Sequence, residues 1–183
     1  MKKEKFLLTV LTVLTVVFFA IFILDKVKEN RNAPVLQKFD DAYITITAPP
    51  MKKSIQNEHL AKNTLNNKIH EASFYKAKYK KIEYAIVYAK YHREVNLKSG
   101  AESIVSTFKD NNFIYETMDN KIKGNKGMLL EGTYELNGVK YAIKEQLIKK
   151  TNTFWQVIVI FPYSEKNNAL AQNYINSINI ICD

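Results

Sequence analysis

The sequence predicts an α+β fold, in which a central antiparallel β-sheet is flanked by helices and preceded by one N-terminal transmembrane helix. Three observations predict it. Residues 6–24 form an apolar run without a charge. An Asn-Gly turn lies between two alternating, strand-like segments near the end of the chain. The last strand-like segment is apolar on both faces, and an amphipathic helical segment follows it.

The apolar run, FLLTVLTVLTVVFFAIFIL, has the length of a membrane span. As a helix it extends roughly 28 Å, which is close to the hydrocarbon thickness of a bilayer. It is longer than the core of a cleaved signal peptide, and neither an Ala-x-Ala site nor a cysteine follows it. We therefore expect an uncleaved signal anchor. Three basic residues stand on each side, so orientation rests on the short N-terminal tail, which favours a cytoplasmic N-terminus.

The expected organisation has four parts. Residues 1–5 are a cytoplasmic tail, 6–24 the transmembrane signal anchor, 25–35 a linker, and 36–183 one α+β domain. We expect a single-pass protein of the cell membrane whose C-terminal domain is extracytoplasmic, in the periplasm or at the cell surface. The formal net charge of +9 indicates a basic surface, although lysines on the wet faces of strands also account for it. The lone cysteine, Cys182, excludes an internal disulfide.

The first half of the domain is expected to open with a strand and a hairpin. Asp41–Ala48 alternates, with its isoleucines toward the core, and two prolines end it. Met51–Lys68 is polar and without period, so we expect an irregular segment there. Ala72–Lys80 and Ile82–Tyr91 read as two strands of a hairpin, while the tyrosine spacing of the second also fits a helix. Ser99–Asn112 is expected to be a helix that begins with a capping box.

The second half is expected to be a three-stranded antiparallel meander closed by a helix. Asn137 and Gly138 form a type I′ turn in "MLLEGTYELNGVKYAIKEQLIKK", and a second turn precedes the last strand. Lys144 and Gln146 are expected on the polar face of the return strand. In "FWQVIVIFP" apolar side chains alternate onto both faces, so both faces need cover. Ser164 is expected to cap the final helix, which folds back onto the sheet.

These segments follow one another in a familiar order. They are ITITAPP, FYKAKY, IEYAIVYAKY, AESIVSTF, KGNKGMLLEG, GTYELNGVKYAIKEQLI, FWQVIVIFP and ALAQNYINSINI. The order resembles that of the PsbP-like family, over residues 36–180. The resemblance implies a central antiparallel sheet flanked by helices, serving as a non-catalytic docking module at a membrane. It carries over no metal or photosystem site, because no residues here match one.

Metal binding is the first chemistry that the sequence offers. The candidate ligands are His59, His70 and His92, with Glu58, Glu71 and Glu94 beside them. Adjacent residues of a strand point to opposite faces, and zinc sites show tighter spacing than this. We therefore expect surface histidines and assign no metal ligand and no cofactor.

Other chemistries have weaker support. A serine hydrolase needs a strained nucleophile turn, and no G-x-S-x-G is present; Ser164 and Ser177 are expected to serve a helix cap and the closing segment. The glycines of "KGNKGM" lead into a strand rather than a phosphate-binding helix. Tyrosines interleaved with lysines suit single-stranded nucleic acid. An extracytoplasmic domain rarely meets nucleic acid, however, so we expect no such partner.

The sequence thus favours a non-catalytic, membrane-anchored extracytoplasmic module for binding or assembly, with a protein partner and the membrane as its contacts. The alternative is an exported small-ligand-binding protein or enzyme with a pocket between sheet and helix. No catalytic, cofactor or metal residue is assigned. The segment Met51–Lys68 is the first candidate for the partner surface. Five residues are expected to be structural: Trp155, Phe161, Tyr141, Asn137 and Gly138.

Overall fold

The computed structural model describes residues 33–54, 69–92, 94, 96–108 and 112–181. They belong to a compact unit that begins at Pro34. Its elements, in order, are β1 (Val35–Phe39), η1 (Asp40–Ala42), β2 (Ile44–Ala48), β3 (Lys52–Lys53), β4 (Ile69–Tyr79), β5 (Ile82–Tyr91), α3 (Leu97–Phe108), β6 (Ile114–Ile122), β7 (Asn125–Leu136), β8 (Val139–Lys150), β9 (Thr153–Pro162), α4 (Glu165–Asn176) and β10 (Asn179–Ile180).

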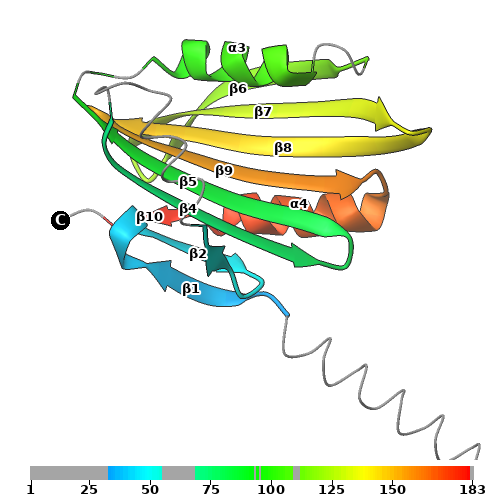
Figure 1. Cartoon of the computed structure of the whole chain (residues 1–183), viewed down its shortest axis with the longest axis horizontal. Helices are drawn as coiled ribbons and strands as arrows, with labels where there is room; N and C mark the ends of the chain where they lie inside the picture. Colours follow the sequence, from blue (N-terminus) through cyan, green and yellow to red (C-terminus); the bar gives the residue numbers. More distant parts are fainter. Residues whose placement is uncertain (1–32, 55–68, 93, 95, 109–111, 182–183) are drawn as a thin grey trace, which may run out of the picture. The chain divides into compact units, whose positions relative to one another are not determined.

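The larger of two sheets has seven antiparallel strands in the order β3-β4-β5-β9-β8-β7-β6. The last long strand of the chain, β9, is therefore the central strand. It joins the β4–β5 hairpin on one side to the meander on the other (Figure 1). This position explains why β9 is apolar on both faces: neighbours flank it on both sides and other elements cover it above and below.

The two faces of β9 lie in two separate hydrophobic cores. Trp155, Val157, Val159 and Phe161 belong to the larger core, which α4 and the small sheet cover. Phe154, with Ile158 and Ile160 packed beside it, belongs to the smaller core under α3. Figure 1 shows α3 on one side of the large sheet and α4 on the other. The predicted cover on both faces of the last strand is confirmed.

The second sheet, of three strands in the order β1-β2-β10, was not predicted. After α4 the chain adds β10 to β2, with Ile180 opposite Ile44. The buried Trp155 of the large sheet is tied to η1, which connects β1 and β2 of the small sheet, because its indole Nε1 donates a hydrogen bond to the carbonyl oxygen of Ala42 at 2.6 Å. Ile44 and Ile46 are fully buried, as their alternation in the sequence predicted.

The predicted α+β class is wrong. Strands make up most of the described residues, they form two sheets rather than one, and only two helices of 12 residues each accompany them in that part of the chain. The single central sheet flanked by helices is therefore replaced by a β-rich fold in which a second sheet takes part of the covering role. No helix within the described ranges is long and apolar enough to cross a membrane. The transmembrane helix predicted over residues 6–24 lies outside those ranges, as do the tail and most of the linker.

Tight turns connect the long hairpins. Asn137 and Gly138 both have positive φ, 52° and 73°, so the predicted type I′ geometry is confirmed. The same pattern recurs at Lys123 and Gly124. The turn between β4 and β5 was not recognisable, because Lys80 and Lys81 have φ of 49° and 67° without a glycine or asparagine. The strand interpretation of Ile82–Tyr91 is confirmed over the helical alternative.

The predicted capping box of α3 is wrong. The helix begins at Leu97, two residues before Ser99. The side chain of Asn96 accepts a hydrogen bond from the backbone N–H of Lys98 at 2.9 Å, which is the role expected of an N-terminal Asn. Gly100 lies inside the helix, where an added Cβ would stand 3.5 Å from the ring of Phe154. By contrast, the predicted cap of α4 is confirmed, since Ser164 Oγ accepts from the N–H of Asn167 at 3.2 Å.

Candidate functional site

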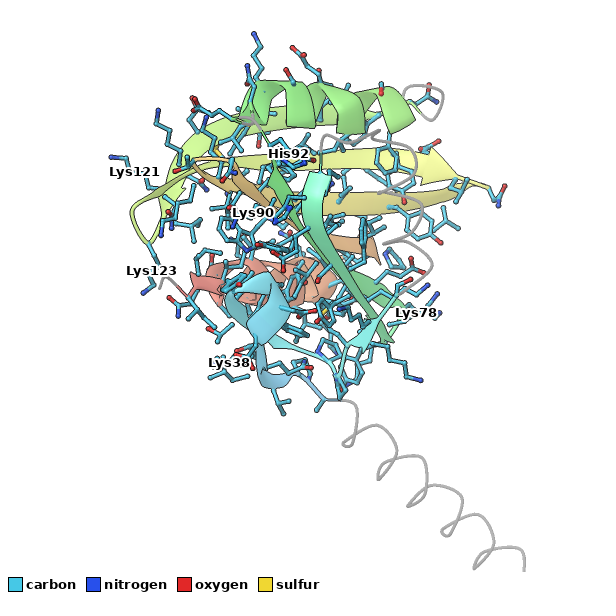
Figure 2. All side chains as sticks on the ribbon, turned by 60° about the vertical axis from the view of Figure 1, so that its left-hand side comes forward. Lys38, Lys78, Lys90, His92, Lys121 and Lys123 are labelled. Atoms are coloured by element: carbon cyan, nitrogen blue, oxygen red, sulfur yellow. The ribbon has the colours of Figure 1, made fainter. Side chains whose placement is uncertain are left out.

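The structure brings two of the three histidines together. The rings of His70 on β4 and His92 after β5 are 5.7 Å apart between centroids. Figure 2 labels His92 beside Lys90, at the end of β5. His59 and Glu58 lie outside the described residues. Within the ranges that are described, no group of three or more His, Cys, Asp or Glu side chains has the arrangement of a metal site.

The remaining candidates from the sequence have other partners. Glu71 accepts a hydrogen bond from Tyr88 at 3.4 Å, and Glu94 forms an ion pair with Lys149 at 2.7 Å. That hydrogen bond and charge lower the pKa of Glu94, an exposed carboxyl group. Ser177 Oγ accepts from the N–H of Thr47 and donates to the carbonyl of Tyr174, which fastens the end of α4 to β2. These contacts stabilise the fold.

The segment Met51–Lys68, predicted as the partner surface, is described only at its start. The backbone N–H of Met51 donates to Gln37 Oε1 at 3.2 Å, and Lys52 and Lys53 form β3. Residues 55–68 lie outside the described ranges. The prediction that this segment binds the partner is therefore not tested.

A hydrogen-bonded cluster around Asp41 ties β3 and β4 to η1. The Asp41 carboxylate accepts from Lys53 Nζ at 2.6 Å, from Ser73 Oγ at 3.0 Å and from the hydroxyl of Tyr75. Burial opposes ionisation, but these three donors outweigh it and lower the pKa of Asp41. The sequence offered no signal for this cluster, because its members lie up to 34 positions apart.

Strand β8 carries an unusual run of buried polar residues. Lys144 and Gln146, predicted on a wet face, are buried. Lys144 binds Glu131 and, at 2.9 Å, Gln172 Oε1 of α4, while Gln146 exchanges hydrogen bonds with Asn120 of β6. Glu145, 1% exposed, faces the smaller core and accepts from Gln156. Burial raises the pKa of Glu145 to about 8, although the Gln156 bond works against the shift. Each polar group is thus partnered, as burial demands.

The open edge of the large sheet is the most distinctive surface. Strand β6 pairs with β7 along its whole length, from Ile114 opposite Thr133 to Ile122 opposite Asn125. Within the described part of the chain no strand pairs with its other side. Seven of its nine residues are exposed, and three of these are large and apolar: Ile114 (75% exposed), Tyr115 and Met118 (each 47%).

A groove of about 550 Å³ lies between α3 and β6. Tyr115, Thr117 and Asp119 line its strand side, because alternate residues of β6 share this face. Its helix side includes Lys98, Glu102 and Ser106, which recur every four residues and so lie along one face of α3. Ala101, Val105 and Met128 supply apolar surface. The groove thus lies between the large sheet and a helix, the position that the alternative function expects for a pocket.

The charges of the groove differ from those of the whole chain. The protein carries a formal net charge of +9, whereas the groove lining holds one lysine and two carboxylates. Strand β6 itself has two acidic residues, Glu116 and Asp119, and one basic residue, Lys121. The β6 edge is therefore a weakly acidic strip on a basic protein. No sequence pattern singled it out, because its exposure depends on which strand is last in the sheet.

Comparisons with known proteins assign no family. No family model matches the chain, and no curated protein does. Among solved structures it is similar to PA94 of Pseudomonas aeruginosa, a protein of unknown function, with 11% identity, a TM-score of 0.39, and coverage of 77% of this chain and 94% of that one. It is also similar to the Ran-binding protein Mog1p of Saccharomyces cerevisiae, with 10% identity, a TM-score of 0.44, and coverage of 81% and 95%.

A third similar structure is LpqN of Mycobacterium tuberculosis, a protein involved in cell envelope biogenesis. It shows 11% identity and a TM-score of 0.42, and the match covers 81% of this chain and 78% of LpqN. At such low identity and with TM-scores below 0.5 these similarities transfer no function, and membership of the PsbP-like family stays a prediction.

Proposed function

We propose that this protein is a non-catalytic module that docks a protein partner from a membrane-held position outside the cytoplasm. The observation that carries the proposal is the open β6 edge. A long strand with exposed apolar side chains presents one row of backbone donors and acceptors, which is a template for another chain. Proteins generally blunt such edges unless they use them.

The polar groups of the domain support a binding role over a chemical one. Lys144 donates to both Glu131 and Gln172, Gln146 bonds to Asn120, and Asp41 serves as an acceptor for three neighbours. Each of these sets stabilises packing between elements. A catalytic assignment would need a reactive group presented to a cavity, and the α3–β6 groove presents charges and hydroxyls without such an arrangement among its lining residues.

The membrane part of the proposal rests on the sequence. Residues 6–24 are uncharged and long enough to hold the chain in a bilayer. Lys26, Lys28 and Arg31 follow them, where each basic residue contributes about 1 kcal/mol with anionic lipid. A C-terminal alkaline phosphatase fusion tests the orientation, because that enzyme is active only outside the cytoplasm. A fusion protein that is fully expressed but inactive contradicts the extracytoplasmic position of the domain.

Site-specific photocrosslinking in native membranes tests the docking role. A photoreactive amino acid replaces Met118 on β6 or, as the control, Lys166 on the exposed side of α4. The proposal expects one discrete crosslinked protein from position 118 and none from 166. The photoreactive residue is also placed at positions 114 and 116. The proposal is contradicted if none of positions 114, 116 and 118 gives a crosslink, or if positions 118 and 166 give the same crosslinks.

A second function is favoured by the groove itself. At about 550 Å³, with apolar surface and three charged side chains, it has the size of a small-molecule site. Native mass spectrometry of the full-length protein from its own membranes tests this. A constant extra mass that disappears in a Val105→Trp variant, in which the indole fills the groove, supports a small ligand. An unliganded mass contradicts this second function.

A further inference from the structure

The β6 edge and the α3–β6 groove are two parts of one surface. Figure 1 shows α3 running beside β6 at the margin of the large sheet. A chain added to the outer side of β6 would continue the sheet and place every second side chain on the face where α3 stands. Its other side chains would point to the opposite face, beside Ile114, Glu116 and Met118. Backbone pairing and side-chain contacts are thus available together, which is how peptides bind by strand addition.

The dimensions suit an extended segment. The nine residues of β6 span about 30 Å as a strand. The polar row of α3, from Lys98 to Ser106, rises about 12 Å over its eight steps, so it faces about four residues of an added strand. Two of these four would direct side chains toward the groove, where Ala101, Val105 and Met128 offer apolar contact.

The charges select the occupant. In the middle of the strip, Glu102 and Asp119 in the groove and Glu116 on the other face favour basic side chains over acidic ones, and Lys98 opposes them. Lys121, Lys123 and Lys126 gather at the β6–β7 turn, so the acidic part of the strip is the part away from that turn. A second copy of β6 fits less well. In a symmetric antiparallel pair centred on Met118, Asp119 of one copy lies diagonal to Asp119 of the other, and like charges at that distance repel.

We propose that β6 accepts an extended segment of the partner protein as an added strand, with apolar and basic residues in alternation and one of its faces in the α3–β6 groove. The inference rests on the proposed docking function and names the binding mode and the chemistry of the partner. An anionic lipid surface or nucleic acid would not select this strip, because its carboxylates repel phosphate.

Nuclear magnetic resonance on the full-length protein in detergent micelles tests the inference. The probe is the acetylated and amidated heptapeptide Lys-Val-Lys-Val-Lys-Val-Lys, and the matched control has Glu in place of each Lys. The expected result is a shift of the amide signals of β6 and α3 by the Lys peptide, with affinity at least about tenfold above that of the Glu peptide. Equal affinity for the two peptides, or shifts confined to other elements, overturns it.

Two charge variants and one sedimentation measurement complete the test. Asp119→Lys is expected to weaken the Lys peptide about tenfold, whereas Glu135→Lys, an equal charge change at the tip of the β7–β8 hairpin, changes the affinity less than about twofold. Equal losses in both variants contradict a local site. A dimer in sedimentation that Met118→Lys dissociates identifies a second copy as the occupant and also overturns the inference.

The two proposals fail separately. If the peptide does not bind while the crosslink at position 118 persists, docking stands and strand addition by a basic, apolar segment is wrong. If neither peptide binding nor the crosslink at position 118 is observed, the docking function and strand addition are both wrong.

Discussion

The two edges of the large sheet differ in how they meet solvent. At one edge β3, made of Lys52 and Lys53, pairs with Lys76 and Tyr75 of β4, and the rest of β4 has no strand on its outer side within the described residues. The other edge is β6, nine residues long and carrying three exposed large apolar side chains. Short, lysine-rich edges resist pairing with other chains, whereas long apolar edges invite it. Where β3 forms the edge, it has the features of a protected boundary, whereas the β6 edge has those of a binding surface.

The same contrast holds for what each edge does inside the fold. Lys53 binds Asp41, so β3 takes part in joining the two sheets. On β6, one side chain on the α4 face, Asn120, is fixed by hydrogen bonds to Gln146, while most of its neighbours are exposed. An edge that contributes little to the core can be changed at little cost in stability, and this separates binding from folding in experiment.

The largest expected effect lies midway between the two edges. Phe161 on β9 is fully buried in the larger core. Its replacement by Ala is expected to lower the free energy of unfolding by about 3–5 kcal/mol, since it removes a ring and leaves a cavity. The matched edge variant, Ile114→Ala, is expected to cost less than about 0.5 kcal/mol. Urea denaturation followed by tryptophan fluorescence measures both, and similar losses would mean that β6 is covered.

The next effect contrasts a buried carboxyl group with the exposed ones of β6. The pKa of Glu145 is about 8 in the folded protein, against 4.5 ordinarily, so the folded state keeps a proton that the unfolded state releases. This contribution is complete below pH 4.5 and is lost as the pH rises to about 8, with a slope of at most about 1.4 kcal/mol per unit. Unfolding measured from pH 5 to 9 is expected to lose this slope in Glu145→Gln. If Glu145→Gln keeps the pH dependence of the wild-type protein, Glu145 is not the group responsible for the slope.

A moderate effect is expected at the β3 edge. Asp41→Ala removes the charged acceptor that Lys53, Ser73 and Tyr75 share. It is expected to lower the free energy of unfolding by about 1–2 kcal/mol, because hydrogen bonds to a charged group are strong but this carboxylate is partly exposed to solvent. Because the pKa of Asp41 is lowered, its contribution is present above pH 3.8 and is lost as the pH falls below that value. Acid unfolding curves of the two proteins should therefore converge at low pH, and curves that stay parallel would contradict the role.

The smallest effect is expected at the turn between β4 and β5, on the β3 side of the sheet. Lys81 has a φ of 67°, a conformation that costs a side-chain-bearing residue energy. Lys81→Gly is expected to raise the free energy of unfolding by about 0.5–1 kcal/mol. The control Lys150→Gly is expected to lower it, because Lys150 does not have a positive φ. A thermal shift of the same sign in both variants would show that strain is not the cause.

The sequence predicted the parts of the fold that local patterns specify. Alternation identified β4, β5 and β9, and Asn137-Gly138 located the hairpin of β7 and β8 with its turn type. Ser164 marked the start of α4. These signals reside in a few neighbouring residues, where backbone sterics and hydrogen bonding decide the outcome.

What the sequence did not predict depends on distant neighbours. Asn179 and Ile180 form a strand only because β2 is beside them. The buried Lys144 and Gln146 look like wet-face residues until their distant partners are known, Gln172 on α4 for Lys144 and Asn120 on β6 for Gln146. The class was wrong for the same reason, since a second sheet assembled from both ends of the domain has no local signature. The β6 edge was likewise invisible, because a strand's place in the sheet is a tertiary property.

Hydrogen exchange of β6, followed by nuclear magnetic resonance on the full-length protein, tests the open edge most directly. In an edge strand, alternate amides point away from the neighbouring strand and have no partner in the sheet. If the β6 edge is open, every second amide from Ile114 to Ile122 is expected to exchange rapidly while the amides of β9 are protected throughout. Continuous protection along β6, at the level seen in β9, would mean that another strand already occupies this edge, and would contradict the account.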